Sequence, residues 1–413
     1  MPSDSLSLVS GYYPCKNLYD IAYAIWIKDI GESMLYRKMK KAAPELSALG
    51  FGCMRLPMKD NGQIDEDLAT SMLRYAIDHG VNYIDTAYPY HNGESEPVVG
   101  RALAGGYREK VHLATKLPSW LIKSREDMDK YLDEQLIRLK SETIDFYLVH
   151  GLIRPFWENL SALGVTDFLN DAIADGRICY AGFSFHDNTT LFKEIVKSYD
   201  WTFAQIQYNF MDEHFQAGTE GLNFAAKKGL DIIVMEPIRG GLLAKDLAGI
   251  SEIWQTAKVK RTPAEWALRW VWNHPEVTVV LSGMSTPEQV RQNVAIAKDG
   301  LPNSLTKKEL ALYRKVKKEF EKRIIIPCTG CKYCSPCPHG VNIPECFEFY
   351  NRGHMYEDKE QTLQFYTMFL GGFFDGIPNY ASLCRECGEC EEKCPQSLPI
   401  RKNLKKVVEY FGK

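Results

Sequence analysis

Short apolar runs alternate with longer amphipathic stretches from about residue 48 to about residue 300. Eight of these runs are four to seven residues long and are bounded by polar or glycine-rich segments, which is typical of β-strands. The predicted strands are Leu49–Cys53, Asn82–Asp85, Val111–Thr115, Ile144–Val149, Ile178–Ser184, Phe203–Gln207, Asp231–Met235 and Val277–Leu281.

The stretches between the predicted strands carry helix start and stop signals. Ser124 is a suitable N-cap for one helix, and Gly80 is a suitable C-cap for another. Proline stands at the favoured first position of two more helices. The predicted helices with these signals are Asp65–His79, Arg125–Leu139, Pro263–Trp272 and Pro287–Ala297.

A strand–helix unit that repeats eight times over about 250 residues predicts an α/β fold of the (β/α)8 TIM barrel type. An open, doubly wound sheet is the competing architecture. Such a sheet would normally carry a glycine-rich phosphate fingerprint after its first strand, and Gly50–Arg55 does not fit the pattern G-x-G-x-x-G. The barrel is therefore the preferred prediction.

The chain is longer than one barrel requires, so we expect flanking parts. Residues 1–35 are predicted to be a poorly ordered N-terminal extension, and residues 36–305 the barrel. Residues 306–327 form a linking helix, predicted at Lys307–Lys322. Residues 328–413 form a small, mostly α-helical, ferredoxin-like domain, with helices predicted at Pro344–Asn351 and Glu357–Leu370.

Composition gives no electrostatic case for nucleic acid or membrane binding. The net charge of the 413 residues is −3, and both signs are well mixed. The apolar stretch Leu18–Ile27 is interrupted by Asp20 and is too short to span a bilayer. We therefore expect a cytoplasmic protein, in which cysteines stay reduced.

Eight of the twelve cysteines lie in two tight runs, and each run ends in Cys-Pro. The second run has the spacing C-x2-C-x2-C-x3-C-P, which holds iron–sulfur clusters in bacterial ferredoxins, where the fourth cysteine binds the other cluster. The first run has two residues instead of three before its last cysteine. The predicted ligands are Cys328, Cys331, Cys334, Cys337, Cys384, Cys387, Cys390 and Cys394.

Several arrangements of these cysteines remain open. If the ferredoxin exchange applies, Cys394 joins the first three cysteines of the first run, and Cys337 joins those of the second. One [4Fe-4S] cluster on the second run alone is the alternative. Zinc is less suited because its sites usually combine two separated pairs, and disulfides are less suited still. The other cysteines are expected to be small, mostly buried apolar residues: Cys15, Cys53, Cys179 and Cys346.

Four ionisable residues fall at or just after the carboxyl ends of predicted barrel strands, where barrel enzymes place their chemistry: Asp85, Tyr90, Lys116 and His150. A Lys116 ammonium would lower the pKa of Tyr90 and make it a better proton donor, and Asp85 would hold Lys116 in place. His150 could orient a substrate carbonyl. These four residues are the candidate catalytic residues.

Residues 36 to about 300 resemble the aldo-keto reductase family. The matching stretches are Gly50–Arg55, Tyr83–Ala87 with Tyr90, Gly93–Glu96, Ala114–Lys116, Asp145–His150, Gly182–Ser184, Gln205–Asn209 and Asn293. With the cysteine-rich tail, the chain resembles the branch that adds a C-terminal 4Fe-4S domain. The resemblance implies NADPH or NADH as the hydride donor, a small carbonyl substrate and protonation by Tyr90.

The resemblance also implies nicotinamide contacts at Ser184 and Gln207, and here the chain departs from the family. Phe185 replaces the usual asparagine, and Met235 stands where an aromatic residue would stack on the nicotinamide. No clear basic residue grips a 2′-phosphate, although Arg239 and Arg291 could substitute. The cofactor-binding candidates are Ser184, Gln207, Met235, Arg239, Arg291 and Asn293.

Three functions of different classes follow from these patterns. The first is NAD(P)H-dependent carbonyl reduction. The second is electron transfer between the clusters and a ferredoxin or other carrier. A flavin is an alternative occupant of the barrel, because coupling hydride to one-electron chemistry normally needs such a group. The third is a nucleotide-binding docking module with structural clusters.

Overall fold

The computed structural model describes residues 34–373 and 376–413. The expectation about residues 1–35 therefore lies almost wholly outside the described residues. The chain divides into two compact units. The first contains the residues up to Pro237 together with Leu268–Ser304, and the second contains Ile238–Ala267 together with Leu305–Lys413.

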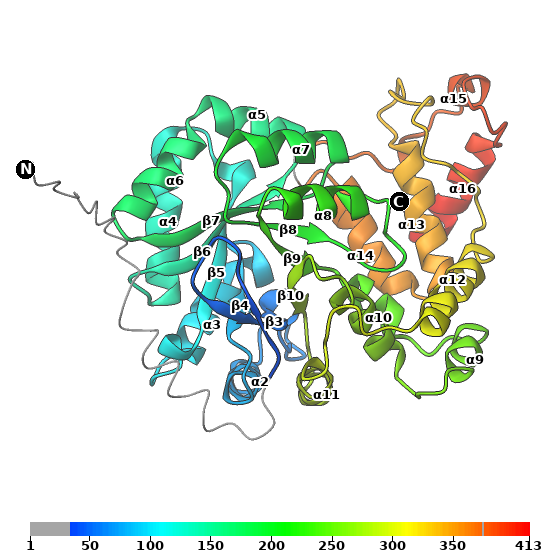
Figure 1. Cartoon of the computed structure of the whole chain (residues 1–413). Helices are drawn as coiled ribbons and strands as arrows, with labels where there is room; N and C mark the ends of the chain where they lie inside the picture. The colour runs from blue at the N-terminus through cyan, green and yellow to red at the C-terminus, as the bar shows by residue number, and fades with distance from the viewer. Residues whose placement is uncertain (1–33, 374–375) are drawn as a thin grey trace, which may run out of the picture. The chain divides into compact units, whose positions relative to one another are not determined.

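The first unit is a closed barrel of eight parallel strands, which confirms the predicted (β/α)8 fold (Figure 1). Each predicted strand is present to within three residues at either end. The strands are β3 (Leu49–Gly52), β4 (Tyr83–Asp85), β5 (His112–Leu117), β6 (Ile144–Leu152), β7 (Ile178–Phe185), β8 (Phe203–Gln207), β9 (Asp231–Met235) and β10 (Val277–Ser282).

Helices surround this barrel. Ser124 is the N-cap of α4, as predicted, and its backbone N–H donates to Asp127 at 3.0 Å. Asp65, predicted as the first residue of its helix, is the N-cap of α2 and accepts a hydrogen bond from Leu68 N at 3.3 Å. The helices of this unit are α2 (Glu66–Asp78), α3 (Ser95–Ala102), α4 (Arg125–Leu139), α5 (Arg154–Ala162), α6 (Val165–Ala174), α7 (Thr189–Ser198), α8 (Gly218–Lys227) and α11 (Pro287–Ala297).

A short antiparallel hairpin, β1 (Tyr36–Lys38) with β2 (Glu45–Ser47), precedes the barrel and was not predicted. Met39 and Leu46 of this hairpin pack in one buried cluster with Tyr83 and Phe203, which begin strands β4 and β8. The hairpin therefore closes the amino end of the barrel. The carboxyl ends of the strands are left for the functional site.

Gly50 lies inside the barrel, where a side chain would not fit. A Cβ atom at this position would come within 2.7 Å of Leu281 and 2.9 Å of Val279, both of which project from β10 into the core. The first glycine of the Gly50–Arg55 stretch is therefore required by barrel packing and not by phosphate binding.

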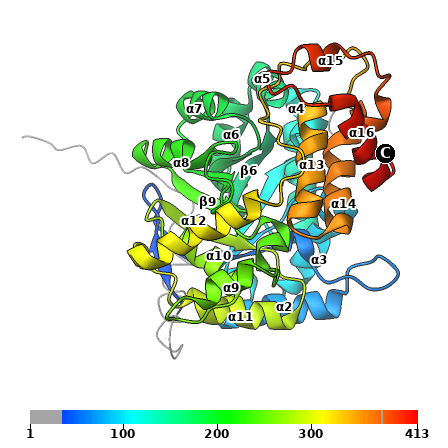
Figure 2. The ribbon, with the colours of Figure 1, turned by 90° about the vertical axis from the view of Figure 1, so that its right-hand side faces the viewer.

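The second unit is mainly helical, as expected for its C-terminal part. Figure 2 shows α13 beside α14 and α16, and these helices contact one another. The helices of this unit are α9 (Ile250–Gln255), α12 (Lys307–Glu321), α13 (Ile343–Met355), α14 (Lys359–Leu370), α15 (Glu389–Glu392) and α16 (Ile400–Phe411), and α10 (Pro263–Trp272) contains the boundary between the two units.

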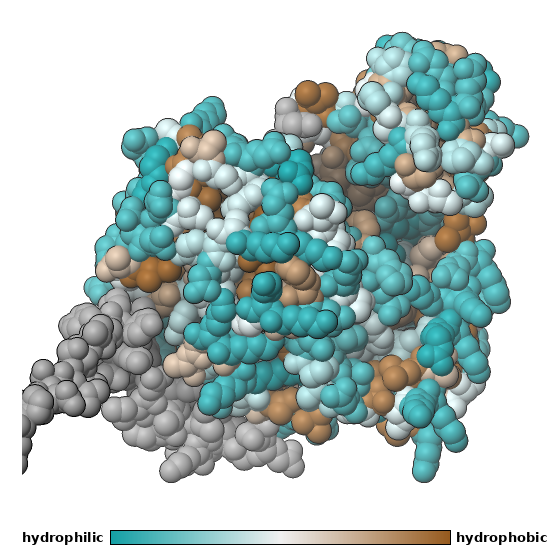
Figure 3. All heavy atoms as spheres, turned by 45° about the horizontal axis from the view of Figure 1, so that its top comes forward, coloured by the Kyte–Doolittle hydropathy of each residue, from teal (hydrophilic) through white to brown (hydrophobic). Residues whose placement is uncertain are grey.

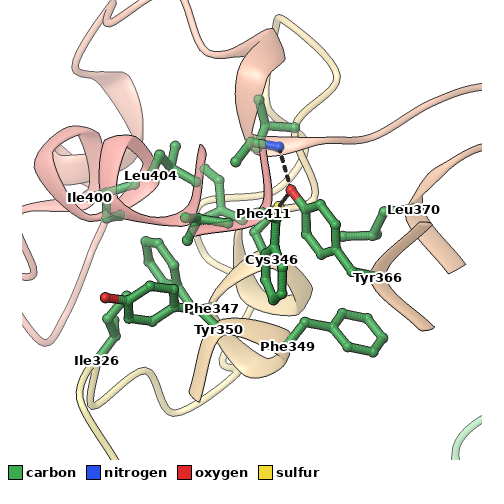
Figure 4. Packing of buried hydrophobic residues seen from close by; sticks show 14 residues of the cluster. Ile326, Cys346, Phe347, Phe349, Tyr350, Tyr366, Leu370, Ile400, Leu404 and Phe411 are labelled. Carbon is green, nitrogen blue, oxygen red and sulfur yellow. Dashed lines mark hydrogen bonds between the residues drawn. The ribbon is translucent and has the colours of Figure 1, made fainter. Parts of the chain in front are cut away.

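An aromatic and aliphatic core joins α13, α14 and α16 (Figure 4). The Tyr366 ring stacks on Phe411 with centroids 4.5 Å apart, and its hydroxyl accepts a hydrogen bond from Ala381 N at 3.0 Å. Cys346 is fully buried in this core, and Cys53 is fully buried in the barrel, as predicted. Cys179 differs from the prediction, because it is half-buried and disulfide-bonded.

The segment Ile238–Ala267 was predicted to be part of the barrel domain 36–305, but it groups with the C-terminal region. Lys245 forms an ion pair with Asp358 at 2.8 Å, and the Trp254 ring packs 5.0 Å from Tyr313. The loop that follows β9 is therefore built into the second unit by contacts with residues far along the chain.

The described helices include none that is long and apolar enough to cross a bilayer. On the face drawn in Figure 3, hydrophilic residues dominate and hydrophobic residues form small, separate patches.

Candidate active site and cysteine sites

The four candidate catalytic residues come together at the carboxyl ends of three adjacent strands. Asp85 ends β4, Lys116 lies near the end of β5, and His150 lies near the end of β6. Tyr90 begins the short helix η3 (Tyr90–Gly93), which follows β4. The parallel register pairs Asp85 with Ala114, so the end of β4 lies beside β5.

Lys116 is the centre of this group. Its side chain is fully buried, and its ammonium donates to Asp85 Oδ1 at 2.8 Å, to Thr86 O at 2.7 Å and to Tyr90 Oη at 3.3 Å. These three partners match the three N–H donors of an ammonium group. The sequence prediction that Asp85 holds Lys116 beside Tyr90 agrees with this geometry.

A tight turn fixes Tyr90. His91 and Asn92 both have positive φ angles, 52° and 55°, which non-glycine residues adopt at a cost of about 1 kcal/mol. The His91 ring compensates by accepting a hydrogen bond from Leu56 N at 3.1 Å. The phenol is therefore held by its own loop as well as by Lys116.

The protonation of Tyr90 differs from the prediction. Burial raises the pKa of Tyr90, and the Lys116 ammonium offsets only part of this effect. The expectation that Lys116 brings the pKa of Tyr90 below its ordinary value is therefore wrong in its net direction. Burial alone would lower the pKa of Lys116, but Asp85 and Tyr90 outweigh it and raise that pKa, so the ammonium form is favoured.

His150 lies beside Tyr90 and is in its neutral form. Burial, with smaller contributions from Lys116 and His186, brings the pKa of His150 well below its ordinary value. Its ring lies 6.2 Å from the Tyr90 ring and 5.2 Å from the Trp120 ring. Within the described part of the chain, its Nδ1 atom is buried and has no hydrogen-bond partner. A neutral imidazole in this position can still donate one N–H to a bound molecule.

A second layer behind Lys116 was not predicted. Gln135 donates to the Lys116 carbonyl at 3.0 Å and to Glu96 at 2.6 Å, and Thr115 also donates to Glu96 at 2.6 Å. Burial raises the pKa of Glu96, and these two donors partly oppose it. The only sequence signal was Glu96 itself, which ends the matching stretch Gly93–Glu96.

The predicted nicotinamide contacts line neighbouring strand ends, but two of them already have partners. Ser184 Oγ accepts from Gly151 N at 2.7 Å, and Gln207 donates to Asp212 at 2.9 Å. Half-buried Met235 ends β9. Gln205, two residues before Gln207 on the same face of β8, donates to Met235 Sδ at 3.7 Å.

Gln205 offers what a bound amide would need. It is almost fully buried, and no residue in the described ranges pairs with its Oε1 atom. An orphaned buried acceptor is costly unless a ligand or water satisfies it. The site therefore fits a nicotinamide carboxamide, and Gln205 is the residue that the sequence prediction passed over in favour of Gln207.

The predicted phosphate ligands have other contacts. Arg239 is buried in the second unit, where it donates to Tyr356 Oη and lies 3.8 Å from Glu348. Arg291 is exposed on α11 and pairs with Glu288. Asn293 is buried and donates to Ser282 Oγ at 2.9 Å. Arg239 therefore has partners within the second unit, and its role as a cofactor ligand stays a prediction.

The cysteine runs line two cavities, and each cavity takes its fourth cysteine from the other run. The Cys328 site is lined by Cys328, Cys331, Cys334 and Cys394, whereas the Cys384 site is lined by Cys384, Cys387, Cys390 and Cys337, with Cys334 also at its edge. All eight cysteines are free thiols. This arrangement agrees with the exchange predicted from the spacing.

The thiols line the walls of the two cavities. Among the described residues, no group of three or more His, Cys, Asp or Glu side chains is arranged to hold a metal ion. Positive φ angles at Gly330, Lys332, Glu386 and Gly388 turn the two loops around the cavities. Thiols spread around a cavity are the donor arrangement that a polynuclear iron–sulfur cluster needs.

Comparisons with known proteins agree with both parts of the chain. Residues 48–315 match the profile of the Aldo/keto reductase family, and residues 327–398 match that of a 4Fe-4S dicluster domain. The uncharacterized oxidoreductase YqkF of Bacillus subtilis is 25% identical over 70% of this chain and 99% of its own length.

Two further relatives and one solved structure are similar over most of their own length. The NADH-specific methylglyoxal reductase of Escherichia coli is 25% identical over 63% of this chain and 91% of its own. The 6-dehydroglucose reductase of Novosphingobium aromaticivorans is 27% identical over 64% and 90%. The holo aldo-keto reductase AKR11C1 of Bacillus halodurans has a TM-score of 0.59 and 26% identity, covering 68% of this chain and 96% of its own.

Proposed function

Since the chain belongs to the aldo/keto reductase family and carries a C-terminal 4Fe-4S dicluster domain, we propose that it reduces a small carbonyl compound with NADPH or NADH. The observation that carries this proposal is the buried Lys116 ammonium, 2.8 Å from Asp85 and 3.3 Å from Tyr90. Relatives whose names describe reductases of methylglyoxal and of 6-dehydroglucose support the reaction class.

A bound nicotinamide would supply hydride to the carbonyl carbon. Tyr90 gives its phenolic proton to the carbonyl oxygen, so that hydride and proton together yield the alcohol. Lys116 stabilises the phenolate that remains, because its ammonium is already in contact with the phenol oxygen. His150, neutral and lacking an internal partner at Nδ1 among the described residues, orients the carbonyl oxygen by donating an N–H.

Ser184, Gln205 and Met235 are the residues that would hold the nicotinamide ring. Gln205 supplies an amide oxygen that has no partner among residues 34–373 and 376–413, and the Met235 thioether supplies an apolar surface beside it. Gln207 supports the site indirectly through Asp212. The choice between NADPH and NADH rests on Arg291, which is exposed and pairs with Glu288, and on Arg239, which contacts Tyr356.

The same proposal assigns two [4Fe-4S] clusters to the second unit. The Cys328 site presents four thiols, three from the first run and one from the second. The Cys384 site presents three from the second run and Cys337 from the first, together with Cys334, which lines both cavities. A second candidate function, electron exchange with a ferredoxin or another one-electron carrier, is favoured by these paired sites. A flavin would be needed if the barrel and the clusters exchange electrons.

Anaerobic titration with NADPH and then NADH tests the proposal against this second candidate. For plain carbonyl reduction, we expect nucleotide oxidation only when a small aldehyde or ketone is added, while the broad visible absorbance of the clusters stays unchanged. Bleaching of that absorbance without a carbonyl compound would contradict the proposal and favour electron transfer.

The pH dependence of carbonyl reduction follows from Tyr90. Burial raises the pKa of Tyr90 above the ordinary tyrosine value of about 10, so the phenol stays protonated through the neutral range. We therefore expect kcat/KM for reduction to be flat from neutral pH to about pH 9 and to fall as pH rises through the raised pKa. An alkaline decline centred well below about 10 would contradict this assignment.

A further inference from the structure

The Cys328 site and the Cys384 site have different walls. The wall of the Cys328 site is largely apolar. Its apolar side chains include Ile343, Pro344, Phe347, Leu398 and Ile400. Phe347, Ile343 and Ile400 belong to the buried core of the second unit drawn in Figure 4. Charged groups are therefore scarce in the wall of the Cys328 site, where Lys332 carries the one charged side chain apart from the thiols.

The wall of the Cys384 site carries three cations, Arg385, Lys393 and Arg401, and one carboxylate, Glu389. Two of the cations are paired, because Lys393 lies 3.9 Å from Glu389 and Arg401 lies 2.8 Å from Glu391. Arg385 forms no ion pair with any described residue. The Cys384 site therefore keeps one uncompensated positive charge beside its thiols.

The charge balance at the Cys328 site is less positive. Lys332 is the one cation in its wall. Glu345 is close enough for Lys332 to act on its pKa, whereas Glu348 lies 3.8 Å from Arg239 and is paired with it. One carboxylate thus opposes the one ammonium at this site, and no positive charge is left uncompensated.

Other influences on reduction potential are similar at the two sites. Each site has one exposed cysteine, Cys331 or Cys387. Each also has a backbone N–H directed at a thiol, from Gly330 to Cys328 and from Glu386 to Cys384. Solvent exposure and amide hydrogen bonds are therefore similar at the two sites. The charge and the apolar character of the walls are the influences on reduction potential that differ.

We propose that the Cys384 site holds the cluster of higher reduction potential and takes the first electron that the second unit accepts. This inference rests on the two-cluster part of the proposed function. Reduction adds one negative charge to a cluster that is already anionic through its four thiolates. A nearby cation stabilises that charge, whereas an apolar wall without a compensating cation disfavours it.

The test is an anaerobic potentiometric titration with dithionite, which donates one electron at a time, followed by electron paramagnetic resonance. For the unaltered protein we expect two one-electron waves. Arg385→Gln should lower the higher midpoint and bring the two waves closer. The matched variant Lys332→Gln should lower the lower midpoint and move the waves apart.

Opposite changes in the separation of the two waves would support the assignment. A single unresolved two-electron wave in the unaltered protein, or a wider separation in Arg385→Gln, would overturn it. Iron analysis accompanies each titration, because a content of about four instead of about eight iron atoms per chain would remove the premise of two clusters. Carbonyl turnover of the same samples is assayed separately, so failure of the reductase proposal is distinguishable.

Discussion

Tyr90→Phe is expected to lower kcat/KM for carbonyl reduction by about two to four orders of magnitude, the usual contribution of a positioned general acid. The substitution removes the phenolic proton together with the oxygen that accepts a hydrogen bond from the buried Lys116 ammonium at 3.3 Å. Phenylalanine keeps the ring that packs against His150. The measurement is steady-state turnover with saturating nucleotide and a small aldehyde.

Tyr88→Phe is the matched control, because Tyr88 lies in the same loop but contacts Glu134 and Arg138 through its hydroxyl. We expect this control to retain activity within a few-fold. Nucleotide affinity, measured by fluorescence titration, should be similar in both variants. Unchanged turnover in Tyr90→Phe would contradict the assigned role of the phenol and favour the electron-transfer function.

The barrel could be predicted from sequence because its strands are buried on both faces. Such strands form nearly continuous apolar runs, and Asp231–Met235 and Val277–Leu281 are examples that coincide with β9 and β10 to within one residue. Asp85, Lys116 and His150 followed from the same pattern, since a polar residue at the end of a buried strand has few structural reasons to be there.

Contacts between distant residues could not be predicted. Arg239 has the spacing of a phosphate ligand after β9, but its guanidinium contacts Tyr356, which is 117 residues away. The alternation of β8 also placed Gln205 and Gln207 on one face, and only the structure shows that Asp212 satisfies Gln207. The net rise in the pKa of Tyr90 comes from burial, which the order of residues does not encode.

The crossed cysteine ligands are expected to give opposite results in two double variants. Cys328→Ala with Cys394→Ala removes two ligands from the Cys328 site alone, so about four iron atoms per chain should remain. Cys384→Ala with Cys394→Ala removes one ligand from each site, so most of the iron should be lost. Iron and sulfide analysis after anaerobic purification measures both outcomes.

Uncrossed sites, each built from one run, would reverse this pattern, because Cys384 and Cys394 would then share a cluster. The double variant Cys328→Ala with Cys337→Ala provides the third comparison. Crossed sites predict that it loses most of its iron, since Cys337 lines the Cys384 site.

Far-UV circular dichroism distinguishes ligand loss from unfolding of α13, α14 and α16, whose buried core packs against Cys328, Cys337, Cys384 and Cys394. Iron retained by Cys384→Ala with Cys394→Ala would refute the crossing, because it requires one intact set of four thiols that excludes both residues.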